Sequence, residues 1–163
     1  MSSPDLTDVE RQAVMAVLNT PNLSMGPQIQ AFEEAFRTYT GLRHAIGVNS
    51  GTAGLHLCVR TAGIQAGDRV LTSPFSFVSS TNVLLFEGAV PVFVDVDPRS
   101  GNMDPQLTAS AAADLAQGGE AARRWLPRKG AEGEGSLKAI LGVDVFGVPA
   151  DWDALAQIAR EHR

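Results

Sequence analysis

The chain has 163 residues, 44% of them hydrophobic, which suffices for one domain with a buried core, and its net charge of −5 argues against binding to nucleic acids or anionic membranes. One cysteine, Cys58, excludes an internal disulfide and fits a reducing cytosol; its place on an apolar helical face indicates core packing. Signal-peptide, membrane-spanning and metal-ligand patterns are not evident, so we expect a soluble cytoplasmic protein without a metal site.

Two helices are predicted at the start of the chain. Thr7 and Glu10 form a capping-box pattern, which predicts a helix ending near Leu18. Pro27 suits the first turn of a second helix, and Gly41 suits its end. Apolar residues of the second helix recur at helical spacing, and we interpret them as a core-facing stripe: Ile29, Phe32, Phe36 and Tyr39.

The stretch 45–55 predicts a short strand over 45–48, a turn of small residues, and a helix that ends at Gly63. Such a turn leaves the first N–H groups of the helix without intrahelical partners, and their partial positive charge favours an anion such as phosphate. Gly51 lets a ligand approach the backbone closely, and the Ser50 and Thr52 hydroxyls are hydrogen-bond donors. The alternative is an ordinary helix cap with nothing bound.

The rest of the chain alternates between strands and helices. Predicted strands cover 70–71, 90–96 and 138–143, and predicted helices cover 79–86, 103–115 and the residues that follow Asp151. Residues 117–136 lack apolar periodicity, so we expect a solvated surface insertion with a short helix near Trp125.

This alternation predicts an α/β fold with an incomplete, mainly parallel sheet and flanking helices. Ligands of such sheets bind beyond the carboxyl ends of the strands. The turn 50–53 and the segment 73–77, which contains Phe75 and Phe77, both lie at such ends. A phosphate-binding turn beside an aromatic ring suits a phosphorylated planar cofactor.

Several motifs together identify a family. In chain order they are Gly26-Pro27, Asn49-Ser50-Gly51-Thr52-Ala53, Gly67-Asp68-Arg69-Val70, Pro74-Phe75-Ser76-Phe77-Val78, Gly88-Ala89-Val90-Pro91-Val92-Phe93-Val94-Asp95 and Gly147-Val148-Pro149-Ala150-Asp151. The sequence resembles the DegT/StrS family of nucleotide-sugar aminotransferases that depend on pyridoxal 5′-phosphate (PLP). The resemblance implies the type I aminotransferase fold, with residues 1–163 as the N-terminal part of the PLP-binding large domain.

The resemblance also implies roles for particular residues. The Thr52 and Ala53 amides and the Thr52 hydroxyl are expected to bind the PLP phosphate, within a turn that includes Ser50 and Gly51. Phe77 matches the position whose ring stacks on the pyridine ring; the alternative is that Phe77 is a core aromatic. Phe75 and Phe86 are core candidates. The implied substrates are a nucleotide sugar and an amino acid, and the implied full-length protein is a homodimer.

The sequence departs from the family pattern in two ways. Asp144 stands where family members usually carry histidine. The aspartate that contacts the pyridine nitrogen and the lysine that binds PLP covalently are expected beyond Arg163, so we expect no catalytic residue within this chain. The leading hypothesis is the N-terminal portion of an aminotransferase that uses glutamate. The alternatives are a fragment of a PLP-dependent sugar dehydratase and a non-catalytic binding or regulatory module of the same fold.

Overall fold

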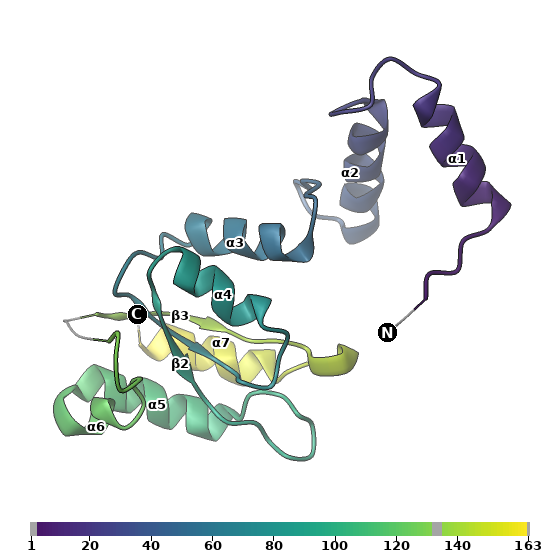
Figure 1. The fold of residues 1–163 in the computed structure, drawn as a ribbon. Helices are drawn as coiled ribbons and strands as arrows, with labels where there is room; N and C mark the ends of the chain where they lie inside the picture. Colours follow the sequence, from purple (N-terminus) through teal and green to yellow (C-terminus); the bar gives the residue numbers. More distant parts are fainter. Residues whose placement is uncertain (1–2, 132–134, 163) are drawn as a thin grey trace. The chain divides into compact units, whose positions relative to one another are not determined.

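The computed structural model describes residues 3–131 and 135–162, and its contacts divide the chain into two compact units. Unit 1 comprises residues 1–49, and unit 2 comprises residues 50–163. Figure 1 shows the helices of unit 1 and the small layered sheet of unit 2. Each unit is described by itself.

The two helices of unit 1 begin and end where the sequence predicts. Helix α1 spans Asp8–Leu18, and the Glu10 carboxylate accepts a hydrogen bond of 2.7 Å from the Thr7 backbone N–H, which completes the capping box. Helix α2 spans Pro27–Thr40, with proline in its first turn and Gly41 in the left-handed conformation after its last residue.

The expected core role of the aromatic stripe on α2 is wrong for unit 1. None of the α2 residues is buried: Phe32 and Phe36 are half exposed, and the Tyr39 side chain is 89% exposed. Helical spacing shows that one face of a helix is apolar, but burial requires a second layer against that face. Within the described part of unit 1, no such layer covers it.

The predicted strand over residues 45–48 does not form either. These residues have no regular secondary structure, and Ile46 is largely exposed. The Gly47 N–H donates to the Glu33 carboxylate at 2.8 Å instead of to a neighbouring strand. A strand is stable only when its backbone groups pair with another strand, so apolar residues alone did not suffice.

Unit 2 is built on a parallel sheet of three strands, in the order β2-β1-β3. Strand β1 spans Arg69–Thr72, β2 spans Val90–Phe93 and β3 spans Leu137–Leu141. This arrangement confirms the predicted α/β fold with a small, parallel sheet. Strand β2 is shorter than the predicted 90–96, because the four residues of β1 offer partners only as far as Phe93.

Helices cover both faces of this sheet (Figure 1). On one face lie α3, Gly51–Thr61, and α4, Ser79–Phe86. The core on this face consists of Val59, Ile64, Val70, Val83, Leu84 and Ala89. On the other face lie α5, Pro105–Gln117, and α7, Trp152–Glu161, whose N-terminus Asp151 caps as predicted. Successive residues of β1 point to opposite faces of the sheet: Val70 belongs to the core under α3 and α4, and Leu71 belongs to the core under α5 and α7.

Two expectations about burial in unit 2 need correction. Cys58, expected in the core, is exposed, because the buried side of α3 is centred on Val59. The segment 117–136, of which 132–134 lie outside the described residues, is expected as a solvated surface insertion with a short helix near Trp125. The short helix is present as α6, Gly119–Arg123, but it buries Ala122 against the core. The sequence stretch is polar overall, but Ala122 and the partly buried Trp125, Leu126 and Ala131 attach it to the core.

Asp114 of α5 also holds this segment. Its carboxylate accepts a hydrogen bond of 2.7 Å from the Trp125 indole N–H and forms an ion pair with Arg124. The Trp125 hydrogen bond, and then Arg124, lower the pKa of the Asp114 carboxyl below its ordinary value. The contact therefore stabilises the fold most fully above the ordinary aspartate pKa and loses its effect as pH falls through the lowered pKa.

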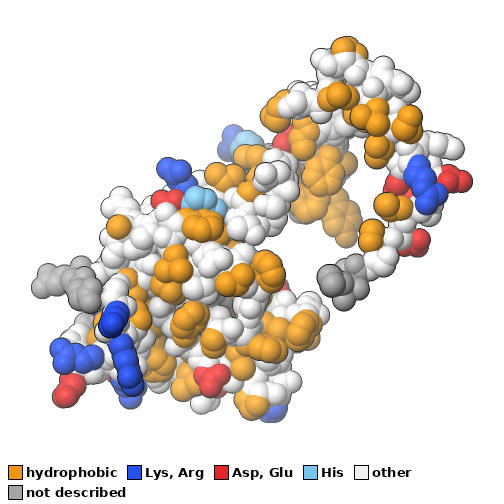
Figure 2. Space-filling view, viewed as in Figure 1, with side chains coloured by type: hydrophobic (Ala, Val, Ile, Leu, Met, Phe, Trp, Pro, Cys, Tyr) orange, Lys and Arg blue, Asp and Glu red, His pale blue; other side chains and the backbone are white. Residues whose placement is uncertain are grey.

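Hydrophobic side chains also remain on the surface of unit 2. Figure 2 shows them on the face that carries α4, where Leu85 and Phe86 are more than half exposed. Among the helices in the described ranges, none has the length and apolar character required to cross a bilayer.

Candidate cofactor site

The candidate site lies at the carboxyl edge of the sheet in unit 2. Helix α3 leads into β1 and α4 leads away from it, so the N-termini of both helices lie at the edge where β1 ends. The two helices run side by side on one face of the sheet (Figure 1). The sequence placed a phosphate-binding turn and an aromatic segment at this edge, and the topology brings both there.

The N-terminus of α3 has the predicted cap. Ser50 is extended, with φ −162° and ψ 157°, and its Oγ accepts a hydrogen bond of 3.1 Å from the Ala53 N–H. The amides of Gly51 and Thr52 precede the first intrahelical hydrogen bond, so the helix itself gives them no acceptor. Ser50 therefore acts as an N-cap, and two amides remain directed toward an incoming anion.

The space beside this N-terminus is open. A Cβ added to Gly51 would have no heavy atom within 4 Å, apart from its chain neighbours and its own helix. A phosphate group can therefore approach the backbone at Gly51 without displacing a side chain. The open space, the unpaired amides and the hydroxyls of Ser50 and Thr52 fit a phosphate monoester.

Phe77 is placed on the surface just before α4. Its ring is 75% exposed, so the alternative that Phe77 is a core aromatic is wrong for this chain. Its carbonyl accepts hydrogen bonds from the Ser80 N–H at 3.1 Å and from the Ser76 hydroxyl at 3.2 Å. These bonds fix the backbone of Phe77 and leave the ring free for a ligand.

The other two aromatic residues of this region also differ from expectation. Phe75 and Phe86, expected in the core, are about half exposed. Each packs edge-on against another ring instead, Phe75 against Phe146 at 6.0 Å between centroids and Phe86 against His56 at 5.3 Å. One side of each ring therefore packs on a neighbouring ring, and the other side faces solvent.

A polar contact ties α3 to the end of α4. The His56 ring nitrogen Nε2 lies 2.5 Å from the Glu87 carboxylate, and the Arg60 guanidinium lies 3.8 Å from the same oxygen. Together with the ring contact between His56 and Phe86, this cluster fixes the spacing of the two helices. The cluster therefore joins α3 to the C-terminal end of α4.

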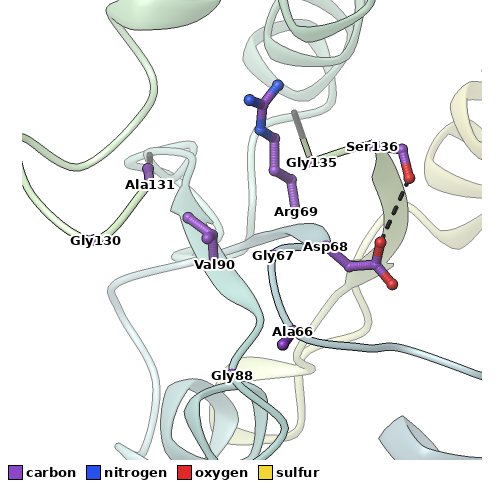
Figure 3. A pocket seen from close by; sticks show the side chains of 10 residues that line it. All are labelled: Ala66, Gly67, Asp68, Arg69, Gly88, Val90, Gly130, Ala131, Gly135 and Ser136. Atoms are coloured by element: carbon purple, nitrogen blue, oxygen red, sulfur yellow. Dashed lines mark hydrogen bonds between the residues drawn. The ribbon is translucent and has the colours of Figure 1, made fainter. Parts of the chain in front are cut away.

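A separate hollow lies at the opposite edge of the sheet (Figure 3). It has a volume of about 450 Å³ and is lined in part by Gly67, Asp68, Gly88 and Ser136, near the amino ends of β1 and β2. The Asp68 carboxylate accepts from the Gln65 N–H at 2.9 Å, which closes a local turn, and from the Ser136 hydroxyl at 3.5 Å, which joins the residues before β1 and β3. Parallel sheets bind ligands at the carboxyl edge, so that edge, and not this hollow, is the candidate cofactor site.

Sequence reasoning missed three residues at the carboxyl edge: Asn102, which it did not consider, Asp144, which it noted only as a departure from histidine, and Phe146. Phe146 has a left-handed backbone with φ 53°, an uncommon conformation for a residue other than glycine. No local signal marks it, apart from the glycine that follows it.

Comparisons with known proteins agree with this fold. The sequence profile of the DegT/DnrJ/EryC1/StrS aminotransferase family matches residues 4–163. The spore coat polysaccharide biosynthesis protein SpsC of Bacillus subtilis is 35% identical over 161 residues, which are 99% of this chain and 36% of SpsC. GDP-perosamine synthase of Caulobacter vibrioides is 36% identical over 163 residues, or 99% of this chain and 38% of the synthase.

Solved structures give the same result. An aminotransferase from Psychrobacter cryohalolentis matches with a TM-score of 0.78 and 30% identity, covering 99% of this chain and 36% of its own. A putative sugar aminotransferase, Spr1654 of Streptococcus pneumoniae, matches in its PMP form with a TM-score of 0.78 and 26% identity. The match covers 99% of this chain and 35% of the Spr1654 chain. The cofactor of this family is PLP. The chain spans just over a third of the length of these relatives.

Proposed function

Since the chain belongs to the DegT/DnrJ/EryC1/StrS aminotransferase family, we propose that it is the N-terminal portion of a PLP-dependent enzyme that transfers an amino group from an amino acid to a keto-sugar nucleotide. Glutamate is the proposed donor. We further propose that the complete enzyme is a cytoplasmic homodimer. The observation that carries the proposal is the pairing of an open helix N-terminus with the exposed Phe77 ring at one sheet edge, in a chain of this family.

The residues of this chain supply binding and orientation. The amides of Gly51 and Thr52 and the Thr52 hydroxyl donate to phosphate oxygens, at the positive end of α3. The Ala53 amide, which the family resemblance also implied as a donor, is already used by the Ser50 oxygen at 3.1 Å, and Gly51 takes its place in the proposal. The Ser50 oxygen already accepts from the Ala53 N–H, so its own O–H is directed away from that bond and can donate to the same phosphate. The phosphate group is thereby fixed at one end of the site.

Phe77 supplies the second point of attachment. Its ring offers a flat apolar face to a planar ring and excludes water from that side. When bound, PLP withdraws electrons from the substrate carbon that gains or loses the amino group. Two fixed points, the phosphate and the ring face, orient the cofactor relative to the sheet edge, where the substrates must enter.

Replacing Thr52 by Val in the complete enzyme is expected to weaken PLP binding. A hydrogen bond to a charged group is worth about 1.5–3 kcal/mol, so the dissociation constant should rise roughly tenfold or more. Fluorescence titration of the apoenzyme with PLP measures this dissociation constant. Thr61→Val is the matched control, because the Thr61 hydroxyl lies at the other end of α3 and bonds to the Leu57 carbonyl. If both variants bind PLP as the unmodified enzyme does, the turn is only a helix cap.

Replacing Phe77 by Ala is expected to weaken PLP retention roughly two- to tenfold and to shift the absorption band of the bound cofactor. Phe77→Trp should be tolerated, because the flat face is kept. The melting temperature of the apoprotein should change little in either variant, because the ring is exposed. Leu85→Ala, in the helix that follows Phe77 and 54% exposed, should leave the band unchanged. An unshifted band in Phe77→Ala would contradict stacking.

A further inference from the structure

The turn Val145–Gly147 (η1) at the carboxyl edge is held by a buried side chain from a distant part of the chain. Asn102 is only 3% exposed. Its Nδ2 donates to the carbonyls of Val148 at 2.9 Å and Pro149 at 3.1 Å, and its Oδ1 accepts from the Val145 N–H at 3.0 Å. Asn102 therefore fastens the turn on both sides of Phe146.

Asp144 closes the same segment. Its Oδ1 accepts from the Ala150 N–H at 2.9 Å and from the Trp152 indole N–H at 2.9 Å. Asp144 thus joins the start of the turn to the start of α7. With Asn102, it leaves the backbone between residues 144 and 150 little freedom to move.

Phe146 at the centre of this turn has an unfavourable backbone and receives no burial in return. Its φ is 53° and its ψ is 24°, a region that costs free energy for any residue with a Cβ. Its side chain is 92% exposed, so the hydrophobic effect does not account for the phenylalanine. A held conformation that displays an aromatic ring points to a role for the ring itself.

The ring of Phe146 contacts the loop that carries Phe77. It packs edge-on against Phe75, at 6.0 Å between centroids and 79° between planes. On another side of Phe75 lies Gly101, where an added Cβ would be 3.4 Å from the Phe75 ring and 3.9 Å from Val145. Phe75, which is 49% exposed, therefore has Phe146 and the turn at Gly101 as neighbours, and it precedes Phe77 by two residues.

We propose that Phe146 is a positioning residue, which, fixed by Asn102 and Asp144, holds Phe75 and thereby orients the Phe77 ring for the cofactor. This inference rests on the proposed function, because it assumes that Phe77 stacks on PLP. A loop that is ordered before the ligand arrives does not lose that freedom on binding, and the affinity is correspondingly higher. Phe146 itself need not touch the cofactor.

The test uses Phe146→Gly and Phe146→Tyr in the complete enzyme. Glycine adopts the left-handed backbone readily, so the turn is kept and only the ring is lost. Phe146→Gly should raise the dissociation constant of PLP about two- to tenfold, the usual effect of losing one aromatic pair, with the apoprotein melting temperature nearly unchanged. Phe146→Tyr keeps the edge-on contact and should bind PLP normally. Unchanged affinity in Phe146→Gly would overturn the inference.

A double variant separates positioning from direct contact. If Phe146 acts through Phe77, adding Phe146→Gly to Phe77→Ala should weaken PLP binding no further than Phe77→Ala alone. Independent, additive losses would overturn the inference and leave the proposed function intact. If the unmodified enzyme binds no PLP at all, the proposed function itself fails, and that result is distinct from both of these.

Discussion

The 163-residue chain, expressed by itself, is expected to transfer no amino group from glutamate to a keto-sugar nucleotide, even with PLP present. Aminotransferase chemistry requires a lysine that binds the cofactor covalently and then moves a proton between two carbons. The lysines of this chain are Lys129 and Lys138. Both side chains are exposed, and neither is near the carboxyl edge by its place in the fold.

The positions of these lysines explain the expectation. Lys138 is the second residue of β3, and residue 137 pairs with Arg69 at the start of β1, so Lys138 lies toward the amino edge of the sheet. Lys129 follows α6 in the segment attached to α5, on the sheet face opposite α3 and α4. A cofactor held as proposed, by Ser50, Gly51, Thr52 and Phe77, would therefore be at the other end of the sheet from Lys138 and on the other face from Lys129.

The experiment is to incubate the purified chain with PLP, reduce it with borohydride and locate any pyridoxyl-lysine by mass spectrometry. We expect scattered, substoichiometric labelling of exposed amines and no turnover. Lys138→Arg and Lys129→Arg variants identify the source of any single adduct. A stoichiometric adduct at one lysine, together with glutamate-dependent amination, would refute this prediction.

The ends of helices were predictable because their signals are local. The Thr7 capping box, Pro27 at a helix start and the Asp151 cap each involve residues within one helical turn, and each is present in the structure. The Ser50 cap at the candidate site was recognisable for the same reason. Such features depend on backbone hydrogen bonds that neighbouring residues satisfy among themselves.

Burial and strand pairing were less predictable because they depend on distant partners. The stripe containing Phe32 and Tyr39 has the spacing of a core helix, but spacing does not reveal what covers the stripe. Asn102 likewise gave no signal, since its partners lie 43 to 47 positions away. The residues proposed to contact the cofactor could thus be predicted from the sequence, but the residues that support the site, such as Asn102, could not.

The core beneath α4 provides the second large effect. Leu84 is 0% exposed and packs with Val70 and Val59, between α4, β1 and α3. Leu84→Ala in this chain is expected to lower the free energy of unfolding by about 2–5 kcal/mol, through lost burial and the cavity that remains. Urea denaturation followed by circular dichroism measures this change.

Leu85→Ala is the matched control for Leu84, because the adjacent residue of α4 is 54% exposed. Leu85→Ala removes the same atoms from the same helix, and it should lower the free energy of unfolding by well below about 1 kcal/mol. The difference between the variants therefore measures the packing of α4 onto the sheet. That packing sets the direction in which the N-terminus of α4 presents Phe77. Equal costs for the two variants would mean that α4 is oriented otherwise than described, and the placement of Phe77 at the carboxyl edge would fail with it.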